Sequence, residues 1–545
     1  MKTTKKLLAM ALAAAMVVTA FAGCSGNNDT SSADSTSSAS SEASTSSDAS
    51  TSDESSATED DGTIHPMRIV QPGTLCPDYE TGMAAVNEKL KEDGVNIEVS
   101  VTRIPWDAYA EKLNLMLTTG EEFELLHVMQ DVKNLSAIAG MGAISSIHDS
   151  IQNYPDLYNK FSETEWLGTL YKGEEYAVPC YWRSFDNVMS YMDYRSDIAE
   201  KVGYDEFPDT TEGIIDLMKK SQDEILNETG MKAYSWMHQV QDTAHWLHRS
   251  YDTYPFYVEN SLGICLIRQD GTVDSFYESE EFKKDANTYY EMYQAGLIDP
   301  DVLNRDHQKK YDDAKFGAML PSQTFDPATG VTMQQNGVEG AEVKWVEAFG
   351  SDVPDMIFYT YVQNLNAISA TSEDPESGLK FLNWLYASEE NHDLFHYGIE
   401  GTHYTKTGDH RIEQVKGDDA NPLYSMDTWM TGYLPYMAYA SDVPDDHIDY
   451  MTYKSENYVI SPAAGFIFDS SNVTSELTNL QTEIISSIYP IKVGMVSYED
   501  NIDAAIEKLK AAGLDKYLEE YRTQFKAYLD ANPDVLEIAK GTTEG

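Results

Sequence analysis

The chain has 545 residues, of which 91 are Asp or Glu and 38 are Lys or Arg, giving a formal net charge of −53. Such a charge excludes most nucleic-acid-binding proteins, because phosphate contacts need Lys and Arg, and it disfavours electrostatic binding to anionic membranes. Hydrophobic residues make up 41% of the chain and aromatic residues 11%, too many for a wholly disordered acidic polymer. We therefore expect an acidic, globular, monomeric protein without a nucleic-acid partner.

Residues 1–23 have the organisation of a bacterial lipoprotein signal peptide. Three lysines precede an apolar stretch, residues 7–22, that is short for a transmembrane helix. The sequence Phe21-Ala22-Gly23-Cys24 resembles a lipobox, although Phe21 stands where Leu is usual. An ordinary signal peptide followed by a chance cysteine is the alternative. We expect cleavage before Cys24 and a lipid on Cys24, which would be the only membrane contact, on the extracellular face of a bacterial cell membrane.

The segment 24–62 follows as a tether. It is rich in Ser and Thr and carries acidic but no basic or aromatic side chains. Such a composition cannot bury enough apolar area to offset its ordering entropy, so we expect a disordered, extended linker. The other cysteines, Cys76, Cys180 and Cys265, are widely spaced and odd in number, which predicts buried free thiols rather than a disulfide framework or a zinc site.

The body begins with a β-α-β-α-β pattern. Periodicity predicts strands at 67–70, 96–101 and 123–128 and helices at 79–91 and 106–117, the second helix ending at Gly120. Later segments follow in chain order: strand 176–179, helix 211–226, helix 282–295, strand 358–362, helix 375–387, and two helices within 501–529 that break at Gly513. Because one sheet cannot cover so long a body, we expect a helix-rich α/β protein with two lobes.

Several segments resemble extracellular solute-binding proteins of ABC importers, in the maltose-binding-protein-like family 1. The order and spacing of these segments carry the resemblance across nearly the whole body, with departures at Glu124 and Glu174. The segments in the body are Trp106–Leu125, Tyr171–Pro179, Gln294–Asp301, Asn366–Tyr386 and Tyr397–Tyr404. Two C-terminal stretches, Phe468–Val473 and Glu507–Lys526, are similar to a lipoprotein subgroup with an extra C-terminal region.

The resemblance implies a periplasmic-binding-protein-like fold of two lobes, a Venus flytrap, whose chain crosses between the lobes more than once. We place these crossings near 181–187, near 358–363 and between 408 and 427. Lobe 1 would then comprise 63–183 and 364–415, and lobe 2 would comprise 184–360 and 416–545, including the C-terminal helices. A ligand would bind between the lobes, and closure would signal the loaded state to the permease subunits of the transporter.

Candidate ligand-binding residues are polar or aromatic side chains that follow predicted strands, lie at predicted crossings, or belong to the segment 397–404, a loop that faces the ligand in the family. Sugars present apolar faces and hydroxyl groups, so a sugar site needs aromatic platforms with amide, carboxylate or guanidinium partners. The candidates are Gln130, Asp131, Tyr181, Trp182, Arg183, Trp236, His238, Tyr361, Gln363, Asn364, Glu400, His403, Tyr404 and Trp429.

The resulting hypothesis is a binding protein that delivers a neutral oligosaccharide to an ABC permease. An anionic solute is disfavoured by the charge of the chain unless basic residues such as Arg183 gather at the site. A peptide or another polar solute is the first alternative, and a surface-anchored glycoside hydrolase with paired carboxylates is the second. Common hydrolase and nucleotide-binding motifs are absent from the sequence, and His245 and His248 lack the partners of a zinc pattern. We therefore expect no cofactor, no metal and no catalysis.

Overall fold

The computed structural model describes residues 63–130, 132–180, 188–189, 191–235, 244–259, 262–304, 309–323, 325, 327–349, 354, 356–417, 421–452 and 457–541. The predicted signal peptide, Cys24 and the tether lie outside this part of the chain. Within the described residues no helix is both long and apolar enough to cross a membrane.

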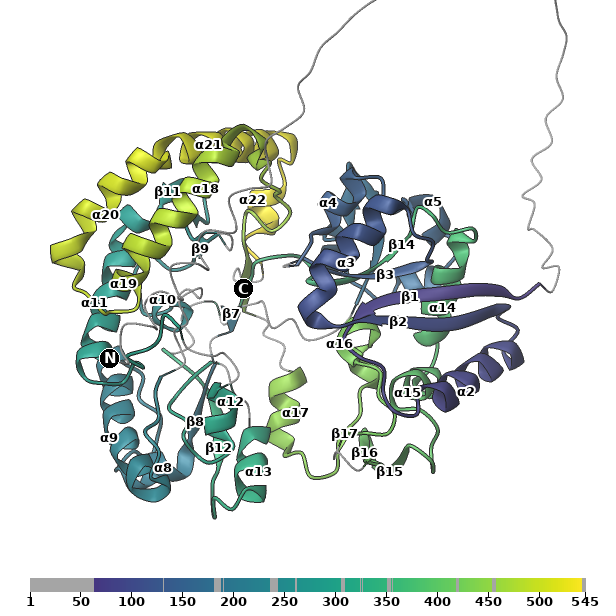
Figure 1. The fold of residues 1–545 in the computed structure, drawn as a ribbon, viewed down its shortest axis with the longest axis horizontal. Helices are drawn as coiled ribbons and strands as arrows, with labels where there is room; N and C mark the ends of the chain where they lie inside the picture. Colours follow the sequence, from purple (N-terminus) through teal and green to yellow (C-terminus); the bar gives the residue numbers. More distant parts are fainter. Residues whose placement is uncertain are drawn as a thin grey trace, which may run out of the picture. The chain divides into compact units, whose positions relative to one another are not determined.

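A five-stranded sheet organises the first part of the body, with strand order β2-β1-β3-β14-β6 (Figure 1). Strand β1 pairs in parallel with β2 and β3, whereas β14 runs antiparallel to both of its neighbours, β3 and β6. The carboxyl ends of β1, β2, β3 and β6 therefore lie at one edge of the sheet, where β14 begins. The strands are β1 (His65–Pro72), β2 (Ile97–Ile104), β3 (Leu125–Met129), β6 (Ala177–Pro179) and β14 (Asn364–Ile368).

Helices cover both faces of this sheet because its strands are apolar on both sides. Met67 and Ile69 pack in one core with side chains of α2 and α14, while Val70 and Leu126 pack in a second core with those of α3 and α4. The helices are α2 (Tyr79–Glu92), α3 (Trp106–Thr119), α4 (Leu135–Gly140), α5 (His148–Ile151), α6 (Pro155–Tyr158), α7 (Glu163–Leu167), α14 (Pro375–Leu385) and α15 (Glu389–Tyr397). A small hairpin, β4 (Leu170–Tyr171) with β5 (Glu174–Glu175), precedes β6.

The second large core lies in the middle and C-terminal parts of the chain. It joins Trp246, Phe256 and Phe282 to C-terminal side chains such as Leu509 and Phe525. The strands of this part of the chain form the sheets β11-β10-β9, β12-β8 and β18-β13-β7. Their bounds are β7 (Val188–Met189), β8 (Tyr191–Arg195), β9 (Phe256–Val258), β10 (Cys265–Arg268), β11 (Val273–Ser275), β12 (Val343–Glu347), β13 (Met356–Phe358) and β18 (Tyr458–Ile460).

Helices make up most of this second part. The α-helices are α8 (Ser196–Lys201), α9 (Thr211–Thr229), α10 (His245–His248), α11 (Glu280–Gln294), α12 (Lys309–Ala314), α13 (Ala328–Gln335), α17 (Asp445–Thr452), α18 (Thr474–Glu483), α19 (Tyr489–Lys492), α20 (Tyr498–Ala512), α21 (Leu514–Ala531) and α22 (Val535–Ile538). Shorter turns are η1 (Phe276–Glu278), η3 (Ser470–Val473) and the π-helical η4 (Ile484–Ile488). On α10, His248 pairs with Asp285 at 3.1 Å.

A third group of short elements lies between α15 and α17 in the chain. It comprises β15 (Tyr404–Gly408), β16 (Arg411–Gln414), α16 (Thr428–Thr431), η2 (Leu434–Tyr436) and β17 (Tyr439–Ala440). Tyr424 and Met426 belong to the core of the five-stranded sheet. Leu434, Met437 and Tyr439 pack instead with Tyr191 and Tyr450. The third crossing, between 408 and 427, and the lobe boundaries stay predictions.

The predicted helices and the first strands are present with small differences at their ends. Gly120 ends α3 at φ 67°, a left-handed conformation that glycine adopts without steric cost. The predicted strand 358–362 is wrong: β13 ends at Phe358 and β14 begins at Asn364. The aromatic and β-branched residues between them have the composition of a strand, which is why the sequence predicts one. The segment instead leaves one sheet and enters another, so it has no neighbouring strand to pair with along its length.

Candidate ligand-binding site

The carboxyl edge of the five-stranded sheet brings together side chains from five separate segments. Open α/β sheets bind ligands at this edge, because loops and helix starts converge there above a rigid scaffold. Trp106 follows β2, Gln130 follows β3, Cys180 follows β6, and Gln363 precedes β14. The short helix α16 packs against β14 at this edge and carries Trp429.

Trp106 and Trp429 form a stacked aromatic pair. Their ring centroids are 5.9 Å apart and the ring planes differ by 22°. Trp106 begins α3 directly after Pro105 and is 56% exposed, an unusual exposure for so large an apolar side chain. The pair therefore presents a rigid, partly exposed aromatic surface of the kind on which the apolar face of a sugar ring packs.

Buried side chains hold Trp429 in place from below. The ring of His127 meets the Trp429 ring edge-on at a centroid distance of 5.1 Å, and burial lowers the pKa of His127 to about 3, so this imidazole is neutral. The Asn366 amide donates to the Met430 carbonyl at 3.0 Å, and the Cys180 thiol donates to the Trp429 carbonyl at 3.3 Å. A helix of one turn is not stable alone, so these contacts from β3, β14 and the residue after β6 are what fix α16.

One carboxylate lies beside the aromatic pair. Arg103, with a side chain only 2% exposed, donates to Asp427 at 2.7 Å and to the Pro72 carbonyl at 2.9 Å. The Asp427 side chain is 50% exposed and directly precedes α16. The buried guanidinium thus positions an exposed carboxylate, which can accept hydrogen bonds from hydroxyl groups while the ion pair remains neutral as a whole.

Gln130, Gln363, Asn364 and Trp429, all predicted from the sequence, do meet at this edge. The Gln130 backbone N–H donates to the Gln363 backbone carbonyl at 3.1 Å, and Asn364 lies opposite Met129 in the antiparallel pairing of β14 with β3. The Gln130 side chain accepts from the Leu135 N–H at 3.0 Å, so it also fixes the start of α4. Tyr361 lies nearby in sequence but is buried.

Glu400, His403 and Tyr404 form a separate group that follows α15. His403 is fully buried: its Nδ1 accepts from the Ile399 N–H at 3.0 Å, and its Nε2 lies 3.0 Å from Asp78. Hydrogen bonds from Thr81 and His403 hold the pKa of Asp78 below its usual range. Tyr404 packs in a small core with Tyr397 and Ile412, and Glu400 is exposed. In this structure His403 and Tyr404 support the loop, and Glu400 alone faces solvent.

Six predicted site residues lie outside the described part of the chain. They are Asp131, Tyr181, Trp182, Arg183, Trp236 and His238. Conversely, Trp106, Arg103 and Asp427 are not among the predicted site residues. Trp106 follows a predicted strand just as Gln130 does, so the same criterion identifies it. The placement of Asp427 depends on a buried arginine more than three hundred residues earlier, which a local pattern does not contain.

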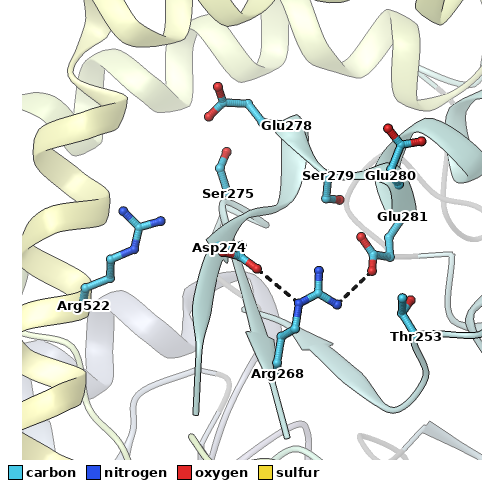
Figure 2. Close-up of a pocket in the computed structure, with 9 residues that line it drawn as sticks. All are labelled: Thr253, Arg268, Asp274, Ser275, Glu278, Ser279, Glu280, Glu281 and Arg522. Carbon is cyan, nitrogen blue, oxygen red and sulfur yellow. Dashed lines mark hydrogen bonds and ion pairs between the residues drawn. The ribbon is translucent and has the colours of Figure 1, made fainter. Parts of the chain in front are cut away.

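A cavity of about 490 Å³ lies in the second part of the chain and contains none of the predicted residues. Figure 2 shows Arg268 between Asp274 and Glu281, with Arg522 reaching towards the cavity from α21. Arg268 lies 3.2 Å from Asp274 and 2.9 Å from Glu281, and the Arg522 Nε donates to the Val273 carbonyl at 2.8 Å. The Arg522 hydrogen bond ties α21 to β11, and the two Arg268 ion pairs tie β10 to β11 and α11, so we interpret these contacts as structural. The lining residues are Thr253, Arg268, Asp274, Ser275, Glu278, Ser279, Glu280, Glu281 and Arg522.

Residues 77–392 match the family described as bacterial extracellular solute-binding protein, and residues 462–530 match a domain of unknown function, DUF3502. Because the first match covers more than half of the chain, the protein belongs to the bacterial extracellular solute-binding protein family. This membership confirms the resemblance seen in the sequence, and it places the chain in a family of binding proteins rather than enzymes.

Two curated relatives span most of the chain. One is a carbohydrate ABC transporter substrate-binding protein of Streptococcus pneumoniae serotype 4, strain ATCC BAA-334 / TIGR4, 23% identical over 471 residues, covering 83% of this chain and 89% of the relative. The other is the polygalacturonan/rhamnogalacturonan-binding protein YtcQ of Bacillus subtilis strain 168, 21% identical over 456 residues, covering 79% of this chain and 86% of the relative.

Solved structures share the fold. The N-glycan transport solute-binding protein NgtS of Streptococcus pneumoniae has a TM-score of 0.68 at 22% identity, covering 86% of this chain and all of that chain. An ABC-transporter-associated solute-binding protein of Bifidobacterium longum infantis ATCC 15697, described as HMO-binding, has a TM-score of 0.59 at 15% identity, covering 85% of this chain and 99% of that chain. The predicted fold, a helix-rich α/β protein of the two-lobed solute-binding type, is confirmed.

Proposed function

We propose that the protein captures a neutral oligosaccharide at the surface formed by Trp106, Trp429 and Asp427 and delivers it to the permease of an ABC importer. The stacked, exposed pair of tryptophans at the carboxyl edge of the sheet carries this proposal. An aromatic face packs against the apolar side of a sugar ring, and the Asp427 carboxylate accepts from its hydroxyl groups. The names of the relatives support a carbohydrate ligand, since both refer to carbohydrate or polysaccharide binding.

The charge of the site favours a neutral ligand. The Asp427 carboxylate is already paired with Arg103, so the pair adds no net charge to the edge of the sheet. The chain as a whole carries a formal charge of −53, which repels anionic solutes approaching from solution. A neutral glycan meets neither a charge-desolvation cost at the site nor repulsion on its approach.

Titration calorimetry on the body, residues 63–545, tests this function. The screen begins with Man1GlcNAc and Man5GlcNAc, which were crystallised with NgtS, and adds kestose and maltose, which were bound to other neighbours. We expect saturable binding of at least one neutral glycan and no binding of short peptides. Binding of peptides without binding of any glycan would reject the carbohydrate ligand and support the first alternative.

The same mixtures test for catalysis. A binding protein leaves the glycan at its original length after prolonged incubation, as mass spectrometry of the supernatant would show. Shortened products would support the glycoside hydrolase alternative, in which two carboxylates act on the glycosidic bond. We propose that the protein has no such activity, because the carboxylate at the site, Asp427, is engaged by a buried arginine.

The lipid anchor leads to a separate prediction. Replacing Cys24 with Ser removes the thiol to which the diacylglyceryl group would be attached, so the mature protein should leave the membrane fraction for the medium. Metabolic labelling with a fatty acid and fractionation of cells measure this directly. A variant with Cys76→Ser is the matched control and keeps its label, whereas label retained by the Cys24 variant would support an ordinary signal peptide.

A further inference from the structure

A lysine between α6 and α7 rests on two tyrosine rings. The Lys160 Nζ lies 5.1 Å from the centroid of the Tyr433 ring and 5.3 Å from that of the Tyr436 ring. It also donates to the Tyr436 hydroxyl at 3.2 Å. All three side chains are half-buried. Attraction between an ammonium and aromatic rings holds the end of a flexible side chain in one place, so Lys160 is a fixed donor.

The ammonium of Lys160 is not engaged by a carboxylate. Other lysines of this acidic chain, such as Lys89, Lys309 and Lys526, each pair with an aspartate one helical turn away. Among the residues that the structure describes, the Lys160 Nζ contacts the two tyrosines and makes no ion pair. An ammonium has three N–H groups, and the Tyr436 hydroxyl accepts from only one of them. The lysine can therefore donate to a ligand, and the Tyr436 O–H can do so beside it.

These residues lie at the opposite end of the sheet edge from Trp106. Cys180, the first residue after β6, donates to the Gly432 carbonyl at 3.5 Å, and Gly432 directly precedes Tyr433. Trp106 follows β2, which is the other outer strand in the order β2-β1-β3-β14-β6. Four steps of about 4.8 Å between neighbouring strands place the two ends about 19 Å apart. Trp429, which stacks on Trp106, lies between them on α16.

The segment 433–437 is fixed to both large parts of the body. The Tyr433 backbone N–H donates to the His392 Nε2 on α15 at 3.2 Å. Leu434 and Met437 are buried in a small core with side chains of β8 and α17. A ligand that meets Lys160 and this segment thus pays little for ordering them, which favours binding.

We propose that Lys160 and Tyr436 form a second sugar subsite, which binds a further unit of a glycan whose first unit packs on Trp106 and Trp429. This inference rests on the proposed function, since it assumes that a glycan binds to the tryptophan pair. Hydroxyl groups of the further unit accept from the Lys160 ammonium and from the Tyr436 hydroxyl. Only a glycan of several units reaches both ends of the edge, so the subsite selects ligands by length.

Calorimetry with short and long glycans on the body, residues 63–545, tests this subsite. The probes are Man1GlcNAc with Man5GlcNAc, and maltose with maltohexaose. Lys160→Met keeps the apolar stem and removes the ammonium. We expect the variant to bind the longer glycan about tenfold more weakly, the effect of losing a hydrogen bond to a charged group, and the shorter one within about twofold of the wild type. Trp106→Ala should weaken both.

Two conservative variants and one control separate direct contact from support. Lys160→Arg keeps the charge and the N–H donors and should retain most of the affinity for the longer glycan. Tyr436→Phe keeps the ring beneath the ammonium but loses the hydroxyl, and it should weaken the longer glycan alone, by about threefold. The control is Lys284→Met on α11, whose Nζ lies 4.7 Å from the centroid of the Tyr251 ring. It should change neither affinity.

A purely structural role of Lys160 would act through the fold and would weaken short and long glycans equally. Equal losses, or full affinity of Lys160→Met for the longer glycan, would overturn the subsite and leave the proposed function standing. Failure of both longer glycans to bind the wild type would also overturn the subsite, whereas the proposed function depends on the whole screen. A melting temperature within about two degrees of the wild type shows that each variant is folded.

Discussion

Replacing Trp106 with Ala should weaken glycan binding by at least tenfold while the protein keeps its fold. The side chain is 56% exposed without ligand, so its removal costs little packing. An aromatic contact contributes about 0.5–1.5 kcal/mol beyond the area that it buries, and the buried area of an indole adds to that. A loss of about 1.4 kcal/mol corresponds to a tenfold change in affinity. Titration calorimetry with the tightest glycan of the screen measures the loss.

The matched control for Trp106 is Phe316, another exposed aromatic residue in the second part of the chain. Phe316→Ala removes a similar side chain away from the carboxyl edge of the sheet, so the affinity should stay within twofold of the wild type. Trp106→Phe keeps a smaller platform and should retain part of the binding. Full affinity in Trp106→Ala would show that the glycan binds elsewhere and would contradict the site proposed above.

Trp429 should respond differently from its stacking partner. It packs on His127 and on the core around α3, so Trp429→Ala removes buried contacts as well as half of the platform. We expect the affinity to fall at least as far as in Trp106→Ala, and the melting temperature to fall with it. The comparison separates a residue that only binds ligand from one that also holds the edge of the sheet together.

How much the sequence predicts differs between local and long-range features. Alternation and helical spacing predict β1, α2, β2, α3 and β3, because each pattern depends on neighbours within one or two turns. The insertion of β14 between β3 and β6 depends on pairing across more than two hundred residues and was not predicted. The same holds for the site: Gln130 and Trp429 were predicted from position, whereas the Arg103–Asp427 pair exists only once α16 has packed on the sheet.

His403 shows that the resemblance of a segment does not determine the surroundings of a single side chain. The segment 397–404 resembles a ligand-facing loop, and a histidine there suggests a polar contact to ligand. In the structure the His403 ring is enclosed between Tyr424, which stacks on it at 5.2 Å, and the backbone of Ile399. Gly398, at φ 85°, has no room for a side chain against that ring. Burial depends on residues far along the chain, so composition and local spacing carry no signal for it.

Arg195→Met should destabilise the second part of the chain by about 3 kcal/mol, the cost of removing one partner from a buried ion pair. The Arg195 side chain is 2% exposed and forms a bidentate ion pair with Asp197 at 2.6 and 2.7 Å. It also donates to the Glu228 carboxylate at 3.1 Å. Its Nη1 donates to the Gly317 carbonyl at 3.0 Å. Burial alone would lower the pKa of Arg195, but Asp197 and Glu228 raise it, so the residue stays charged.

The location of Arg195 makes this loss large. The residue ends β8 and joins that strand to the C-terminal end of α9, which carries Glu228, and to the turn at Gly317. Met keeps much of the apolar stem but leaves Asp197 without its guanidinium partner and Glu228 with only Lys201, which lies 3.1 Å from it and is more exposed. Repulsion between these two carboxylates then adds to the desolvation cost of each. Urea denaturation followed by circular dichroism measures the change in unfolding free energy.

Lys526→Met is the control for Arg195→Met, because it removes a cation from an exposed ion pair. Lys526 pairs with Asp530 one helical turn away on α21, and both side chains are largely exposed. Exposed pairs of this kind contribute about 0.3–0.5 kcal/mol, so the control should unfold almost as the wild type does. Equal stability of the two variants would mean that water reaches the Arg195 cluster freely.

Because Arg195 lies away from Trp106 in the fold, the folded fraction of Arg195→Met should bind glycan with the affinity of the wild type, which separates loss of fold from loss of site.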